Sequence, residues 1–492
     1  VSESVFTLMV GAIFALAGCS DGDPQPKKDT SAGPDAIADT SADIGIVTDT
    51  VATPTDAAPS QDTNAPAQTW SVMVYMAADN NLEKSGILDI EEMLTVTATS
   101  HLRFLVQTDR AEGFYQLGLD TIDAWTGTKR LIVKDGKVAE LTDLGEINMG
   151  EAKSLEDFIK WAAAEEKSDK NVLVLWNHGM AWQGFGGDDF SNDQMTLEEI
   201  REGIEKGLAG SDLKQFDLAG FDACLMGDIA VARMMKPFAP YLVASEDLEP
   251  SHGWNYGAFD IVAKNPSTTV TALGNEIIKQ YQVQAKEQKR QHSITMALYD
   301  MSKLDALDKA WVAFTEDLAK ALEVGSTGKG DGPLQVALAK ARKKVQRFGR
   351  SSTPKHDYQM VDIRDLAFLM STLDPTFKPQ YADINSALTK LVKTRVSGPL
   401  TKGSRGLSVY FPELAELQLP LFEAVPQMGE WRKVLQAFHA AGKAAAGDAP
   451  KFKGGCSGCN VGKQTAEPSC STGGQLEAKK ELDAATVQAA VD

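Results

Sequence analysis

A histidine and a cysteine stand just beyond two stretches that we predict to be neighbouring β-strands. His178 follows the apolar run Val172–Trp176, and Cys224 follows the run Phe216–Phe221. Ligands of open parallel sheets bind beyond the carboxyl ends of the strands, so these two side chains can meet across one crevice although they are far apart in the sequence. An imidazole next to a thiol can take its proton, and the thiolate is the nucleophilic form.

Each of these residues also has an ordinary structural interpretation. A cysteine at the end of an apolar strand is often a small buried hydrophobic residue, and a histidine before a glycine can serve packing alone. The pair by itself therefore indicates nucleophilic catalysis but leaves the structural alternative open.

The segments that must position this pair alternate between two types. Short apolar runs rich in β-branched residues are typical of strands buried on both faces, and helical patterns lie between them. Strands that alternate with helices of this length predict βαβ units and a mostly parallel sheet. The expected strands are 70–77, 102–107, 172–176, 216–221, 241–245 and 294–299, and the expected helices include 82–94, 154–166 with Ser154 as N-cap, and 196–208 with Thr196 as N-cap.

The chain begins with a targeting segment. The apolar run Val5–Leu16 is too short to span a bilayer and fits a secretory signal, and it leads into Leu16-Ala17-Gly18-Cys19, which resembles a bacterial lipobox. We therefore expect residues 1–18 to be a lipoprotein signal peptide. Lipidation of Cys19 would anchor an exported protein to a membrane of the cell envelope, in a leaflet that the sequence leaves open. The alternative is a plain signal peptide.

Four further regions follow from composition. Residues 19–69 contain no aromatic residue, and positions 20–69 hold nine Asp and two Lys. We therefore expect this stretch to be a disordered tether. Residues 70–301 form the core, and 302–446 form a mainly helical part with a late strand at Leu407–Phe411. The tail, 447–492, is small and polar. The tail contains Cys456, Cys459 and Cys470. These three cysteines are compatible with a metal or redox role, or with one disulfide and a leftover thiol.

The overall composition excludes several classes of protein. The formal net charge is −19, which argues against nucleic acid as a partner because phosphate binding needs a basic surface. Five cysteines among 492 residues are too few for a disulfide-framework protein.

Five segments, in order, resemble the clostripain family of cysteine peptidases, which belong to the caspase-like clan. They are 72–82, 173–179, 221–226, 244–246 with Gly253-Trp254, and 406–412. The resemblance implies a caspase-like αβα sandwich with a mostly parallel central sheet, of which 70–301 is the catalytic core. It also implies endopeptidase activity on protein or peptide substrates.

The resemblance assigns roles to single residues. Cys224 matches the nucleophile and His178 the general base, and the backbone N–H groups of Gly179 and Cys224 are candidates for the oxyanion hole. Asp222 matches an acidic residue in the pocket for the side chain that precedes the cleaved bond, which predicts cleavage after Arg, with Lys as a second candidate. His252 departs from the small or acidic residues expected at its position and weakens a strict Arg preference.

Two acidic groups near these motifs have open interpretations. Glu246, Asp247 and Glu249 could add negative potential, but we favour a solvated acidic loop. Asp188 and Asp189 could bind calcium, which some relatives use, but two adjacent carboxylates supply too few oxygens, and we favour a solvated turn. We expect no required cofactor, with calcium as the one candidate. The rival function is a non-catalytic lipoprotein that binds peptides or a partner on the same scaffold.

Overall fold

The computed structural model describes residues 67–111, 118–119, 122–165, 167–324, 332–350, 357–412 and 428–445. The predicted signal peptide, the lipidation site Cys19, nearly all of the tether and the cysteines of the tail lie outside these residues. Among the helices of the described ranges, none combines the length and apolar character that crossing a bilayer requires.

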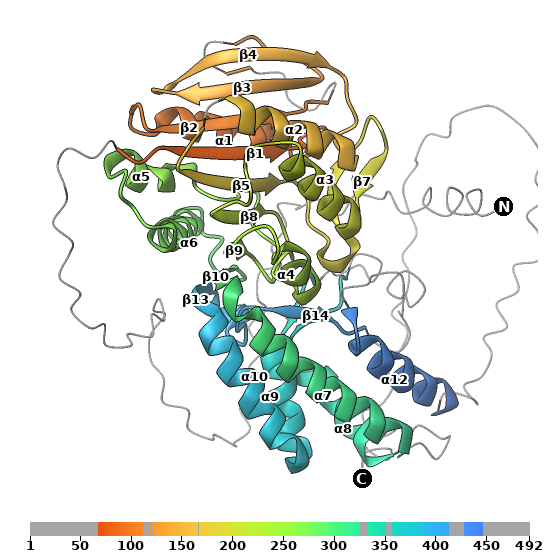
Figure 1. Cartoon of the computed structure of the whole chain (residues 1–492). Helices are drawn as coiled ribbons and strands as arrows, with labels where there is room; N and C mark the ends of the chain where they lie inside the picture. Colours follow the sequence, from red (N-terminus) through yellow and green to blue (C-terminus); the bar gives the residue numbers. More distant parts are fainter. Residues whose placement is uncertain are drawn as a thin grey trace, which may run out of the picture. The chain divides into compact units, whose positions relative to one another are not determined.

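A nine-stranded mixed sheet forms the centre of the body (Figure 1). Its five middle strands are parallel, and an antiparallel pair of strands extends each edge. In spatial order the strands are β13 (Val392–Ser397), β10 (Thr295–Asp300), β9 (Tyr241–Ala244), β8 (Leu218–Asp222), β5 (Lys170–Trp176), β1 (Trp70–Met76), β2 (Leu102–Thr108), β3 (Thr128–Lys134) and β4 (Lys137–Gly145).

Helices cover both faces of this sheet, so the predicted αβα sandwich is present. In β1 alternate residues enter two different cores: Met73 and Tyr75 pack on one face, and Val72 and Val74 on the other, as the period-2 geometry of a strand requires. The first face is covered by α2 (Ala152–Glu165), α3 (Leu197–Ala209) and α4 (Ile229–Met235), and the second by α1 (Glu83–Thr95), α5 (Asp260–Lys264) and α6 (Val270–Glu287).

The C-terminal part is mainly helical and also adds strands. It supplies β13 to the main sheet, whereas the predicted late strand lies in a separate three-stranded sheet in the order β11-β12-β14. The elements are α7 (Leu304–Val324), α8 (Pro333–Lys344), β11 (Arg347–Phe348), β12 (Met360–Asp362), α9 (Ile363–Leu373), α10 (Lys378–Leu391), β14 (Ser408–Tyr410) and α12 (Trp431–Ala445). The remaining short elements are the hairpin β6 (Phe185–Asp188) and β7 (Asp193–Met195), and the 3₁₀ helices η1 (Ala181–Gln183), η2 (Tyr256–Phe259), η3 (Met301–Lys303), η5 (Pro375–Phe377) and η6 (Pro399–Thr401).

The two predicted helix caps have different outcomes. Thr196 caps α3 as expected, because its side chain accepts the Glu199 N–H while the Glu199 carboxylate accepts the Thr196 N–H, which is a capping box. The prediction that Ser154 caps a helix is wrong. The helix α2 already begins at Ala152, and the Ser154 hydroxyl donates to the Asn148 carbonyl oxygen.

A pair of buried carboxyl groups joins the core to the C-terminal part. Glu246 follows β9 and Asp362 ends β12, and both are fully buried. Glu246 accepts from the Ser404 hydroxyl and from the Gly406 N–H at 2.9 Å, and Asp362 accepts from the Arg405 N–H at 2.6 Å. Burial and their mutual repulsion raise the pKa of Glu246, and burial raises the pKa of Asp362 to about 6, because a buried environment disfavours the charged form of a carboxyl group.

Candidate functional site

The strands β5 and β8 bring the predicted pair of side chains to one edge of the sheet. They are parallel neighbours with Trp176 opposite Asp222, and His178 and Cys224 each lie two residues further on. The two backbones touch beyond the strand ends, because a Cβ atom on Gly179 would lie 1.9 Å from the Cys224 carbonyl oxygen. Only glycine fits at position 179, so the close approach of the two strand ends depends on it.

The His178 side chain is half-buried and held by Asn81. Its Nε2 atom lies 2.8 Å from Asn81 Oδ1, and an amide oxygen can only accept, so the proton is on Nε2 and the Nδ1 lone pair is the basic site. Burial lowers the pKa of His178 to about 4. The ring is therefore neutral near pH 7, which is the state that can accept a proton.

Sequence reasoning gave no role to Asn81, although it lies within a segment that resembles the family. It belongs to the turn after β1, and its neighbour Asn80 fixes that turn by donating to Gly187 O at 2.8 Å and to Asn177 Oδ1 at 3.1 Å. The signal that could have found it is the polar Asp-Asn-Asn run directly after a fully buried strand. Such a run at a strand end commonly faces a ligand site.

The Cys224 side chain is only 7% exposed and lies in a constrained turn. The Glu249 N–H donates to Cys224 Sγ at 3.2 Å, a contact that favours the anionic sulfur. The next residue, Leu225, has a φ of 67°, which is uncommon for a residue with a side chain, and its N–H donates to the Asp247 carbonyl oxygen at 3.1 Å. The turn is thus fixed by its hydrogen bonds, and with it the sulfur.

The first candidate donor for an oxyanion hole lies beside this sulfur-bearing turn. Gly179 forms an isolated bridge with Phe185. The bonds of that bridge run from Met180 N to Gly184 O and from Gly186 N to His178 O, so the bridge does not use the Gly179 N–H. The Gly179 backbone lies against that of Cys224.

Asp222 is covered by the segment that leads into η2 and is not open to solvent. It is 4% exposed, and its oxygens accept from the Trp254 N–H at 2.9 Å and from the Tyr256 hydroxyl at 3.2 Å. Burial raises the pKa of Asp222 to about 7. An ionised carboxylate has about four acceptor positions, so two bonds leave capacity for a ligand.

The favoured interpretation of Glu246, Asp247 and Glu249 as a solvated acidic loop is wrong. Glu246, Asp247 and Glu249 are 1%, 9% and 6% exposed, because the loop after β9 packs against Cys224 and against the C-terminal part. His252 is also buried; its Nδ1–H donates to the Gly253 carbonyl oxygen at 2.8 Å, and its ring packs 5.6 Å from that of Tyr281.

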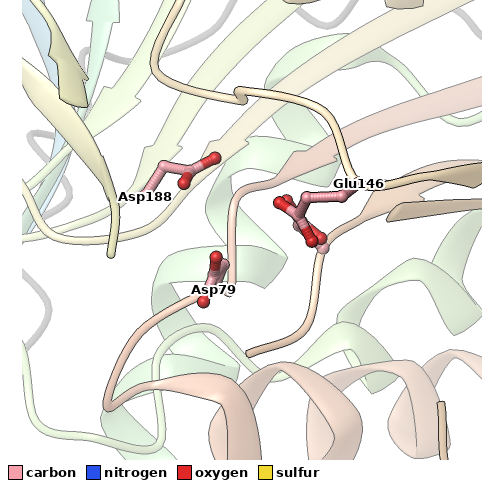
Figure 2. Close-up of side chains that lie close together, drawn as sticks. Asp79, Glu146 and Asp188 are labelled. Atoms are coloured by element: carbon pink, nitrogen blue, oxygen red, sulfur yellow. The ribbon is translucent and has the colours of Figure 1, made fainter. Parts of the chain in front are cut away.

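Four carboxylates from four segments meet at the same edge of the sheet, and we refer to them as the acidic cluster. They are Asp79 after β1, Asp109 after β2, Glu146 after β4 and Asp188 at the end of β6, with one oxygen of each within 4.8 Å of the others. Figure 2 shows Asp79, Glu146 and Asp188 directed toward one another. The favoured solvated turn is therefore wrong for Asp188, which is fully buried, whereas Asp189 is exposed.

The acidic cluster is electrostatically unfavourable as it stands. Burial and the neighbouring carboxylates raise the pKa of Asp79 to about 6, of Glu146 to about 7 and of Asp109 to about 8. Asp109 Oδ2 is buried and has no hydrogen-bond partner within the described residues. Glu83 adds further repulsion toward Asp79 although it is paired with Arg110 at 2.6 Å.

Comparisons with known proteins agree on one family. A model of the clostripain family of peptidases matches residues 74–386. Clostripain from Hathewaya histolytica is 29% identical over 225 residues, which cover 38% of this chain and only 41% of that relative's own length.

Two solved structures have the same fold. An inactive zymogen C11 protease from Parabacteroides distasonis is 19% identical with a TM-score of 0.51, over 77% of this chain and 99% of that one. A secreted C11 cysteine protease from Bacteroides thetaiotaomicron, solved with an irreversible peptide inhibitor, is 17% identical with a TM-score of 0.53, over 74% and 98%. These likenesses confirm the predicted fold class.

The contact between Asn81 and His178 predicts a change in thiol reactivity. In a background in which the other cysteines are replaced by Ala, Asn81→Ala should slow alkylation of Cys224 by iodoacetamide at pH 7 about fivefold, because a lost hydrogen bond of about 1 kcal/mol frees the imidazole to turn away from the thiol. Asn81→Asp keeps the acceptor and should restore part of the rate. An unchanged rate in Asn81→Ala would show that Asn81 does not position the ring.

Proposed function

The chain belongs to the clostripain family of cysteine peptidases, and we propose that it is a cysteine endopeptidase with Cys224 as nucleophile and His178 as general base. The observation that carries the proposal is the meeting of two adjacent parallel strand ends, with Gly179 packed on the Cys224 backbone. The matched region of the curated relative is less than half of that protein, so the activity is argued from this site.

The arrangement supports a standard acyl transfer. His178 takes the thiol proton on Nδ1, and the sulfur of Cys224 attacks the scissile carbonyl carbon. The oxyanion that forms accepts from the N–H groups of Gly179 and Cys224. His178 then gives the proton to the leaving amine, and the thioester is hydrolysed by water that the same imidazole activates.

Specificity for a basic residue before the cleaved bond rests on the carboxylate of Asp222. The Trp254 N–H and the Tyr256 hydroxyl hold this carboxylate. Asp222 is the last residue of β8, two positions before Cys224. A guanidinium can bind such a carboxylate in two places, and an ammonium binds as a point charge. We propose Arg as the preferred residue and Lys as the second.

We also propose that the chain is exported and anchored by lipid at Cys19, with residues 19–69 as a tether. The lipobox-like sequence after an apolar run supports this proposal, as does the description of one structural relative as secreted. Protein or peptide substrates outside the cytoplasm would then be the partners of the body.

Calcium is the cation that the acidic cluster fits best. Ca²⁺ prefers six to eight oxygen ligands, and four carboxylates with one buried, unpartnered oxygen supply a hard donor set of that kind. Asp79, Asp109, Glu146 and Asp188 would hold the ion, which would supply positive charge that offsets their repulsion. The cluster shares the turn after β1 with Asn81, so we propose a structural role that supports His178.

Removal of the nucleophile tests the proposed activity. Cys224→Ala should abolish cleavage of peptides with Arg or Lys before the cut while the melting temperature changes little, because only the sulfur is lost. The matched control replaces Cys456, Cys459 and Cys470 by Ala and should keep full activity. Activity in Cys224→Ala would contradict the assignment, and failure of the native protein to be labelled by a thiol-reactive peptide with a terminal Arg would favour the non-catalytic rival.

The raised pKa of Asp222 gives specificity a defined pH dependence. A carboxyl group with a pKa of about 7 is mostly neutral at pH 6 and ionised at pH 8, so the ratio of kcat/KM for an Arg substrate to that for its neutral citrulline analogue should rise about tenfold over this range. Asp222→Asn should leave the ratio low at both values. Asp217→Asn, just before the other end of β8, is the control and should behave as the native chain. A steep ratio in Asp222→Asn would exclude Asp222 as the determinant.

Cation binding predicts different responses from two neighbouring carboxylates. Millimolar CaCl₂ should raise the melting temperature of the native chain by several degrees, because an ion that binds only the folded state stabilises it. Asp109→Asn should lose most of this shift, whereas Asp189→Asn should keep it because Asp189 is outside the acidic cluster. Equal shifts in both variants, measured by scanning calorimetry, would rule out this site.

A further inference from the structure

A cavity of about 210 Å³ lies between the edge of the main sheet and two helices of the C-terminal part. It is lined from α9 by Arg364, from β13 by Lys393 and Arg395, and from the loop before β14 by Arg405. Figure 1 shows α9 and α10 beside β13. Four basic residues and no carboxylate line this cavity, in a chain whose net charge is −19.

Two of the three arginines are oriented by the fold. Arg364 donates from Nε to Asn385 Oδ1 at 2.9 Å, and its guanidinium lies over the rings of Phe368 and Tyr381 at 5.9 and 5.5 Å. Arg405 donates to the carbonyl oxygens of Lys402 and Ser404, each at 2.7 Å. These contacts use only part of the five N–H donors of each guanidinium.

Arg395 has no such partner. Within the described ranges its guanidinium makes no hydrogen bond or ion pair, although the side chain is half-buried. Burial, and after it the like charges of Arg405 and Arg364, lowers the pKa of Arg395. Three guanidinium groups therefore repel one another around a space without a counter-charge of its own.

The nearest carboxyl groups do not neutralise this cluster. Glu246 and Asp362 attract Arg395, but neither forms an ion pair with it within the described residues. However, Asp362 accepts backbone N–H groups of Asp365 and Arg405, and Glu246 accepts the N–H of Gly406. Both are fully buried and neither lines the cavity, so the cavity offers its basic groups to an anion from outside.

We propose that this cavity binds a phosphate group, supplied as inorganic phosphate or as a phosphate monoester of a small molecule. A tetrahedral dianion presents several oxygens in different directions and can engage three guanidinium forks at once, whereas a carboxylate presents only two oxygens in one plane. The volume exceeds the roughly 30 Å³ that one water occupies, so the site has room for the group and a small substituent.

The site is separate from the proposed peptidase centre. Its residues come from α9, α10, β13 and the loop before β14, and none is among the residues that we assign to catalysis or specificity. The proposal therefore stands or falls independently of the proposed function.

The test uses the full chain and measures phosphate binding by calorimetry and by the shift in melting temperature. Inorganic phosphate and glycerol 3-phosphate are titrated separately, with sodium chloride and acetate at matched ionic strength as controls for screening. Native protein should bind one equivalent of the phosphate probe, and tighter binding of glycerol 3-phosphate would identify the monoester as the source. Arg395→Gln should weaken binding about tenfold or more, while Arg201→Gln, which removes the same charge from an exposed position on α3, should bind as the native chain does.

A second signature separates a ligand site from a structural role of Arg395. Because burial, and after it the like charge of Arg405, disfavours the charge of Arg395 in the folded state, Arg395→Gln should melt no lower than the native chain without phosphate, and lower than the native chain with phosphate. Lys393→Gln, at an exposed position on β13, should weaken binding by a smaller factor. Because Lys393 is exposed, this variant keeps the test valid if Arg395→Gln does not fold. Equal shifts with acetate and phosphate, or native affinity in Arg395→Gln, would overturn the proposal.

Discussion

The parallel pairing of β5 with β8 is the constraint on which the site depends. Their register places Trp176 opposite Asp222, and both strands are fully buried over their last residues, so a shift by one residue would turn apolar side chains away from their cores. This register decides that an imidazole and a thiol from distant parts of the chain emerge at the same level. The absence of a side chain at Gly179 then lets the two backbones approach to contact.

Burial of carboxyl groups is the cost of the arrangement around this edge. Asp222, Asp247, Asp228 and Glu246 all have pKa values raised by burial, and each is held by donors from the backbone or from hydroxyl groups. A buried carboxyl group that lost these donors would be strongly destabilising. The loop after β9 is therefore a packed part of the interior that links the Cys224 turn to the C-terminal part, and its acidic sequence does not mark it as surface.

The sequence was sufficient for the central part of the fold and insufficient where contacts are long-range. Apolar runs such as 70–77 and 172–176 predict β1 and β5 because strands buried on both faces need no polar alternation. The hairpin β3–β4 was not predicted, because β4 is largely exposed and carries charges at three of its nine positions. The emergence of His178 and Cys224 at one edge of the sheet could be anticipated from strand ends, but the acidic cluster could not, since its four members come from separate segments. Asn81 was missed because its contact with His178 joins the turn after β1 to the end of β5, which are far apart in the sequence.

The turn after β1 carries Asp79 and Asn81 on either side of Asn80, and this adjacency has a thermodynamic consequence. Two events that both restrict one short turn are linked, and linkage between equilibria is reciprocal. An ion held by Asp79, as proposed, would narrow the orientations open to the imidazole beyond Asn81. By the same free energy, a covalent adduct that locks the imidazole against the sulfur would strengthen the binding of that ion.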